Sequence, residues 1–183
     1  IYGRGSTLEA NPREANVGAG TDAILETIRL TPELLPFKTK GVLLAVSSYE
    51  ALERNRYRIA PVNQRIEGIL DGGHNTLAIG MYILSMALEA NDQKLSHKVK
   101  NWEDFKASWK TNHDIVEEYL TQEKGKEESP ADFLIPVELQ VPADMNETAG
   151  VQNFRDHLVD ICESRNNNVE MHLSAKVHKH AYL

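Results

Sequence analysis

The residues best suited to chemistry lie in one short segment, residues 71–76, with the sequence Asp-Gly-Gly-His-Asn-Thr. A strand-like apolar segment, residues 65–70, precedes it, and a long apolar segment, residues 77–91, follows it. This pattern predicts a strand, a tight glycine turn and the beginning of a helix. Because the first turn of a helix carries unpaired backbone N–H groups and the positive end of the helix dipole, we predict a phosphate or carboxylate site here.

The side chains of this segment strengthen the prediction of an anion site. Gly72 and Gly73 let a ligand approach the backbone closely. The other predicted ligand-binding residues of the segment are His74, Asn75 and Thr76, which carry donor groups. The alternative is an ordinary strand-to-helix turn in which Asn75 or Thr76 only caps the helix.

His74 and Asp71 are the predicted catalytic residues. His74 would donate a hydrogen bond or act as an acid or base. Asp71 would either hold one tautomer of His74 or bind a divalent metal such as Mg²⁺ that accompanies a phosphate. A metal-dependent nuclease is a further alternative, and it would need several carboxylates around its metal ions. The candidates for that cluster are Asp71, Glu67 and Glu163.

Two other segments contain groups that can neutralise a phosphate. Asn11-Pro12-Arg13 combines a rigid turn with an arginine, which binds phosphate through two parallel hydrogen bonds. Residues 165–168, Arg-Asn-Asn-Asn, suit either a binding turn or a helix end. The predicted ligand-binding residues of the two segments are Asn11, Arg13, Arg165 and Asn167. The alternative for each is an ordinary surface residue.

The composition is typical of a folded domain. The 183 residues are 41% hydrophobic and 26% charged, which predicts a single domain, residues 1–183, with a proper core. The net charge of −7 argues against a general nucleic-acid-coating surface but leaves room for a local basic groove. Cys162 is the single cysteine, so we expect a reducing, cytoplasmic setting. No apolar segment is long enough to predict a membrane span.

The hydrophobic pattern predicts a mixture of helices and strands. The expected helices are residues 21–30, 77–91, 102–119, 151–164 and a last short one from Val169, and the expected strands are residues 41–47, 57–61, 65–70 and 133–141. The short linker at residues 61–64 predicts a hairpin. Strands and helices do not alternate regularly, so we predict the α+β class. We expect a mixed sheet of short strands packed against a buried central helix, residues 77–91, which is apolar nearly all round.

Four segments in a fixed order together resemble a known family. They are Asn11-Pro12-Arg13, residues 27–45, the Ile-Leu-Asp-Gly-Gly-His of residues 69–74, and the Glu-Ser-Arg-Asn-Asn-Asn-Val-Glu of residues 163–170. The chain resembles the abortive-infection phage-resistance (AIPR) family of bacterial defence proteins. Proteins of this kind are usually longer, so the resemblance implies an excised or truncated part of a longer AIPR-type protein. It also implies partners among the other domains of that protein or among defence-system proteins.

The turn is also similar to the Asp-Gly-x-His-Arg signature of ParB/sulfiredoxin-like and DGQHR-type proteins. The matching residues are Asp71, Gly72 and His74. In those proteins the turn opens a helix that binds nucleotide phosphates, so the resemblance implies a ParB/sulfiredoxin-like core that binds a nucleotide or nucleic acid. Asn75 stands where the signature has arginine, and the lost positive charge weakens the case for nucleotide hydrolysis more than for anion binding. The acidic net charge and this loss favour the alternative of a non-catalytic protein-interaction or sensor module.

Overall fold

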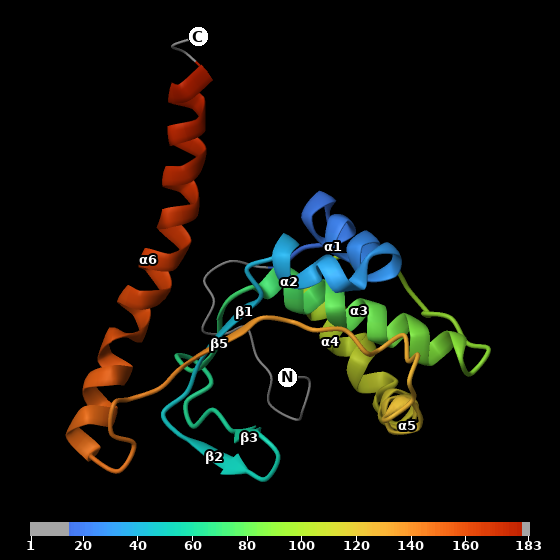
Figure 1. Cartoon of the computed structure of the whole chain (residues 1–183), viewed down its shortest axis with the longest axis horizontal. Coiled ribbons are helices and arrows are strands. Elements are labelled where there is room, and N and C mark those ends of the chain that lie inside the picture. The colour runs from blue at the N-terminus through green and yellow to red at the C-terminus, as the bar shows by residue number, and fades with distance from the viewer. Residues whose placement is uncertain (1–14, 181–183) are drawn as a thin grey trace. The chain divides into compact units, whose positions relative to one another are not determined.

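The computed structural model describes residues 15–180, with side chains described for residues 15–165. It contains helices and short strands without regular alternation, which confirms the α+β class. Most of the elements are labelled in Figure 1, and in chain order they are α1 (Ala19–Leu30), η1 (Pro32–Leu34), α2 (Leu35–Lys38), β1 (Val42–Ala45), β2 (Tyr49–Leu52), β3 (Arg56–Ile59), β4 (Gly68–Asp71), α3 (Gly73–Glu89), α4 (Trp102–Thr111), α5 (His113–Glu123), β5 (Val137–Gln140) and α6 (Thr148–His180).

The described chain divides into two compact units, each built from segments that are distant in sequence. The first unit contains residues 43–71 and 138–180, and the second contains residues 15–42 and 72–137. The chain therefore passes from one unit to the other within or beside β1, β4 and β5. The described part of the predicted single domain, residues 15–180, thus contains two compact units.

A three-stranded sheet has the strand order β4-β1-β5. β1 and β4 are antiparallel. On the other side of β1, the Val42 N–H donates to the Pro136 carbonyl at 2.9 Å, and the Val46 N–H donates to the Gln140 carbonyl at 3.1 Å. The two bonds advance in the same direction along both strands, so β5 runs parallel to β1. The sheet is therefore mixed, as predicted.

Helix α6 covers the sheet in the first unit. Leu43, Ala45 and Leu70 from the strands form a buried cluster with Leu158 and Cys162 from α6. The Cys162 thiol also contacts the Leu70 carbonyl at 3.4 Å. Cys162 is thus a core residue. The sequence pattern assigned the covering role to the helix after the glycine turn, whereas in this unit α6 takes it.

Helix α3 is the buried helix of the second unit. Leu77, Leu84 and Ala87 are fully buried, and α3 contacts α1, α4 and α5. Its sequence is apolar nearly all round, so several neighbouring helices can bury it at once. Within residues 15–180, every helix is too short or too polar to cross a lipid bilayer.

The predicted hairpin is wrong in position. β2 pairs with β3 around a turn at residues 53–55, and β4 begins only at Gly68. The sequence of β2, Tyr-Glu-Ala-Leu, has weak strand propensity, so its pattern did not predict a strand. Arg54 and Asn55 both have positive φ values, 61° and 55°, in this turn. Without a glycine the turn lacks the usual sequence signal of a hairpin.

Three other boundaries differ from the prediction. The expected helix over residues 102–119 is two helices, α4 and α5, with Asn112 between them. Helix α6 continues through residues 165–168, so the predicted helix end and binding turn there are wrong. Asparagine lowers helix stability by only a few tenths of a kcal/mol, which a helix can tolerate. β5 begins after Pro136, which has no N–H to donate to a neighbouring strand.

Candidate functional site

A single residue, Gly72, connects β4 to α3. Its φ of 87° and ψ of 21° lie in the left-handed region, which glycine adopts without the strain of a side chain. Space is also limited, because a Cβ at Gly72 would lie 2.9 Å from the Val42 Cα and still closer to the Gly41 carbonyl oxygen. Both conformation and packing therefore require glycine here, and the sharp turn lets α3 begin immediately after the half-buried Asp71.

Two side chains of the predicted ligand site form hydrogen bonds that stabilise the turn. The Asn75 amide donates to the Gly41 carbonyl at 2.6 Å. The buried Thr76 hydroxyl donates to the Gly72 carbonyl at 3.0 Å, and the Thr76 N–H donates to the same oxygen at 2.9 Å. Asn75 thus attaches the first turn of α3 to the residue before β1. These contacts agree with the alternative in which Asn75 and Thr76 serve the turn rather than a ligand.

The groups that the turn can offer to a ligand are mainly backbone donors. The N–H groups of the first helical residues, Gly73 to Asn75, have no acceptor within an α-helix, and the helix dipole adds positive potential there. His74 is exposed at this point and adds a side-chain donor. The arrangement can bind an anion, and the adjacent Asp71 carboxylate would oppose it unless a cation lay between them.

The described residues contain no group of three His, Cys, Asp or Glu side chains arranged for a metal ion. Mg²⁺ in phosphate sites is often held by only one or two carboxylates together with phosphate oxygens. Asp71 fits that type of site, in which the phosphate supplies further ligands. A two-metal nuclease needs more carboxylates, so the nuclease alternative gains no support from the described residues.

The other predicted ligand residues are not brought to the turn by any contact that the structure describes. The Arg165 guanidinium bonds to the Glu138 carboxylate within the first unit, which partly neutralises its charge. Asn11, Arg13 and the side chain of Asn167 lie outside the described residues. Their contribution to phosphate binding stays a prediction.

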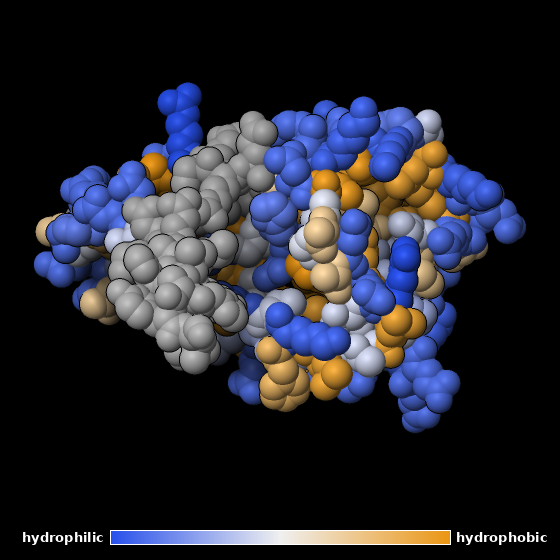
Figure 2. Space-filling model, turned by 90° about the horizontal axis from the view of Figure 1, so that it is seen from above, coloured by the Kyte–Doolittle hydropathy of each residue, from blue (hydrophilic) through white to orange (hydrophobic). Residues whose placement is uncertain are grey.

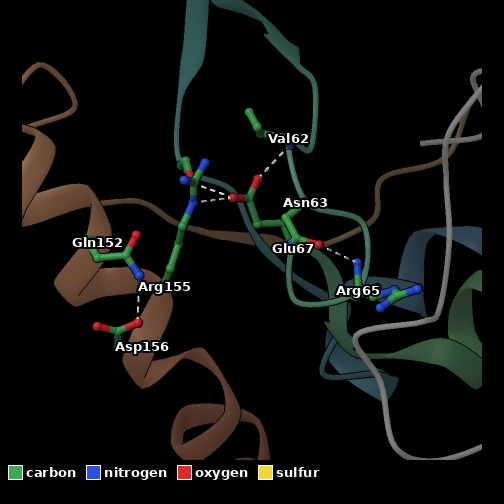
Figure 3. A network of polar contacts seen from close by, with 8 residues as sticks. Val62, Asn63, Arg65, Glu67, Gln152, Arg155 and Asp156 are labelled. Carbon is green, nitrogen blue, oxygen red and sulfur yellow. Dashed lines mark hydrogen bonds and ion pairs between the residues drawn. The ribbon is translucent and has the colours of Figure 1, made fainter.

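A buried polar network around Glu67 was not predicted (Figure 3). Glu67 is fully buried. One carboxylate oxygen accepts from the Ser47 hydroxyl and from Arg155 Nε, the latter at 3.0 Å, and the other accepts from the Val62 N–H at 2.8 Å. Arg155 Nε also lies 2.7 Å from the Ser47 hydroxyl oxygen. The network links α6 through hydrogen bonds and an ion pair to the end of β1 and to the loop before β4.

This network explains the position of Glu67, which was a candidate metal ligand. Its carboxylate is occupied by donors from three segments, so it is a structural charge of the first unit. Glu163, the other candidate, is an exposed residue of α6. The sequence could not indicate the network because Arg155 lies 108 residues from Ser47 and 88 from Glu67.

Acidification is expected to weaken the Glu67 network. Burial by itself would raise the pKa of Glu67, but the hydrogen bonds from Ser47, Val62 and Arg155 outweigh it, so the pKa lies below its ordinary value of 4.5. The folded state therefore binds fewer protons than the unfolded state, and stability falls as the pH falls. The contribution is fully present above pH 4.5 and is lost as the pH drops through the lowered pKa.

Urea unfolding midpoints across this acid range measure the effect. The Glu67→Gln variant removes the titrating group and is expected to show a smaller loss of stability on acidification than the wild-type chain. Equal pH dependence of the two proteins would contradict the assignment.

No protein-family model, curated protein or solved structure matches this chain. The AIPR and ParB/sulfiredoxin-like resemblances therefore stay predictions that rest on the sequence segments quoted above.

Proposed function

We propose that the turn of residues 71–76 binds a phosphate group of a nucleotide or nucleic acid in a bacterial phage-defence protein of the AIPR type. The observation that carries the proposal is the left-handed Gly72 directly between β4 and α3. It allows the first N–H groups of α3 to form an anion site at the end of a strand. The exposed side chain of His74 beside these groups supports the same function.

Each residue of the turn has a defined role in this proposal. The backbone N–H group of His74 donates to a phosphate oxygen, and the exposed His74 imidazole donates a further hydrogen bond. Asp71 repels a bare anion, so it favours a phosphate that arrives with Mg²⁺. Arg13 is proposed to neutralise further charge. Because Asn75 is neutral and bonded to Gly41, the site is suited to binding more than to hydrolysis.

Replacing His74 with alanine is expected to weaken phosphate binding about tenfold, the cost of losing one hydrogen bond to a charged group. The measurement is thermal shift and calorimetry on the full chain with inorganic phosphate, ATP and a short oligonucleotide, each with and without Mg²⁺. Binding to the folded state raises the unfolding midpoint by mass action. Since His74 is exposed, its removal is expected to leave the midpoint of the free protein unchanged.

The matched control is His157→Ala, which removes another exposed histidine, on α6. This variant is expected to bind all three probes as the wild-type chain does. Absence of a midpoint shift with every probe, or equal weakening in both variants, would contradict the proposed site.

An exposed apolar surface favours a second candidate, a protein-interaction module. Leu30 at the end of α1 is 71% exposed and Phe37 in α2 is 85% exposed, with Leu34 of η1 between them in sequence. Figure 2 shows hydrophobic atoms open to solvent among charged ones on the molecular face seen from above. Three large apolar side chains that are exposed within eight residues of the chain favour a surface that binds another protein. A folded chain that binds none of the phosphate probes would favour this candidate, with another domain or a defence protein as its partner.

A further inference from the structure

The β2–β3 hairpin is a concentration of positive charge in an acidic chain. The hairpin itself, residues 49–59, contains three of the nine arginines of the protein and two glutamates, a net charge of +1, and Arg65 follows it, whereas the whole chain carries −7. The three arginines of the hairpin, Arg54, Arg56 and Arg58, are all exposed. A local excess of positive charge on a negative protein indicates a surface for a polyanion.

The pairing of the hairpin places two of these arginines on one face. Glu50 is opposite Arg58, and Leu52 is opposite Arg56. Because side chains alternate along a strand, Arg56 and Arg58 share a face and lie about 6.6 Å apart along β3. This spacing is comparable to that of successive phosphates along a nucleic-acid strand. Arg54 extends the positive surface to the tip of the hairpin, where its φ is 61°.

The arginines on this face can exchange their present partners for phosphate groups. Arg58 forms an ion pair with Glu50, and both side chains are more than half exposed, at 66% and 57%. An exposed pair of this kind contributes little to stability, so an incoming phosphate can replace the carboxylate. Arg56 uses one of its five donors on the Glu53 carbonyl, at 3.1 Å.

The opposite face of the hairpin carries aromatic rings. Tyr57 and Tyr49 lie on that face and meet edge to face, with ring centroids 5.5 Å apart. Tyr57 is 56% exposed, which leaves much of its surface open to solvent. Unpaired bases stack on exposed aromatic rings, so Tyr57 offers such a surface on the face opposite Arg56 and Arg58.

We infer that the β2–β3 hairpin binds the phosphate backbone of a polynucleotide through Arg54, Arg56 and Arg58. A two-stranded ribbon is narrow enough to enter the major groove of a duplex, and Tyr57 offers a stacking surface for a single strand. Both polynucleotides present the same phosphate chemistry to the three arginines. The inference does not depend on the phosphate site proposed at residues 71–76, because it rests on other residues.

The test is fluorescence anisotropy of the full chain with a labelled single strand and with the corresponding duplex, at several salt concentrations. Three phosphate contacts predict a slope of log affinity against log salt of about −2 for the single strand and about −3 for the duplex. Between about 50 and 200 mM salt the affinity is therefore expected to fall roughly 20- to 40-fold. Changing any one arginine to glutamine is expected to reduce the slope by about 1.

Two further variants separate charge contacts from damage to the hairpin. Glu50→Gln releases Arg58 from its ion pair and is expected to tighten binding, which a merely destabilised hairpin would not do. Tyr57→Leu is expected to weaken single-strand binding about tenfold and to leave duplex binding unchanged if the single strand is the ligand. If Tyr57→Leu binds each probe as tightly as the wild-type chain does, the ligand of the hairpin is the duplex.

The matched control removes three exposed lysines outside the hairpin, Lys94, Lys110 and Lys124, by changing each to glutamine. Its salt slope is expected to equal that of the wild-type chain, and so is that of His74→Ala, which reports on the other proposed site. The inference is overturned if neither probe binds, or if the lysine variant loses as much slope as the arginine variants. It is also overturned if a polyglutamate peptide competes as well as an unlabelled oligonucleotide, because the partner would then be an acidic protein.

Discussion

Replacing Gly72 with alanine is expected to lower the free energy of unfolding by about 3 kcal/mol or more. An L-residue in the left-handed region costs about 1–2 kcal/mol, and forced overpacking adds about 1–3 kcal/mol. Both penalties apply at Gly72, where φ is 87° and a Cβ would lie 2.9 Å from the Val42 Cα. The neighbours are backbone atoms at the start of β1, which cannot move without disturbing the sheet. Urea unfolding of the two proteins measures the difference.

Gly125→Ala is the matched control for this change. Gly125 has nearly the same φ, 85°, but a Cβ there would meet nothing within 4 Å. The free energy of unfolding of this variant is therefore expected to fall by about 1 kcal/mol, which is the cost of the left-handed conformation alone. The difference between the two variants isolates the close approach of the turn to Gly41 and Val42. Equal losses would show that the turn is not packed against the start of β1.

The expected destabilisation of Gly72→Ala also limits what this variant can report about ligand binding. Because Gly72 is required for folding, a loss of ligand binding in Gly72→Ala would not identify a phosphate site. His74 is exposed and makes the better functional test. Asn75 and Thr76 are also structural residues, since the Asn75 side chain bonds to the Gly41 carbonyl and the Thr76 side chain bonds to the Gly72 carbonyl.

Replacing Arg155 with alanine is expected to cost about 3 kcal/mol of stability. Removing one partner of a buried ion pair leaves the other charge without compensation, which typically costs about 3–5 kcal/mol. The lower end of this range applies because Arg155 retains 25% side-chain exposure, whereas Glu67 has none. After the change, Glu67 would keep only the hydrogen bonds from Ser47 and Val62. The measurement is the urea midpoint at neutral pH.

Two comparisons make this expectation specific. Arg58→Ala removes an arginine from an exposed ion pair and is expected to change stability by less than about 1 kcal/mol. The double variant Glu67→Leu/Arg155→Leu replaces the pair with apolar side chains and is expected to recover much of the loss. An Arg155→Ala variant as stable as Arg58→Ala would contradict the structural role of the network.

The strand, the glycine turn and the buried helix around residues 68–89 were predictable from sequence because the causes are local. Gly72 permits a conformation that other residues avoid, and the apolar residues from Leu77 onward require burial whatever surrounds them. The α+β class followed from the irregular order of the expected strands and helices. These features depend on residues that are close together in the sequence.

Other features depend on partners that are remote in sequence, and only the tertiary structure decided them. The Glu-Ala-Leu of β2 becomes a strand because β3 pairs with it, although its own propensity is weak. Helix α6 continues across residues 165–168, where single-residue preferences predicted an end. Glu67 is buried as a charge because Arg155, 88 residues away, lies beside it, and no local pattern can report such a contact. The charge of the hairpin was present in the sequence, but its placement on one face required the pairing register of β2 and β3.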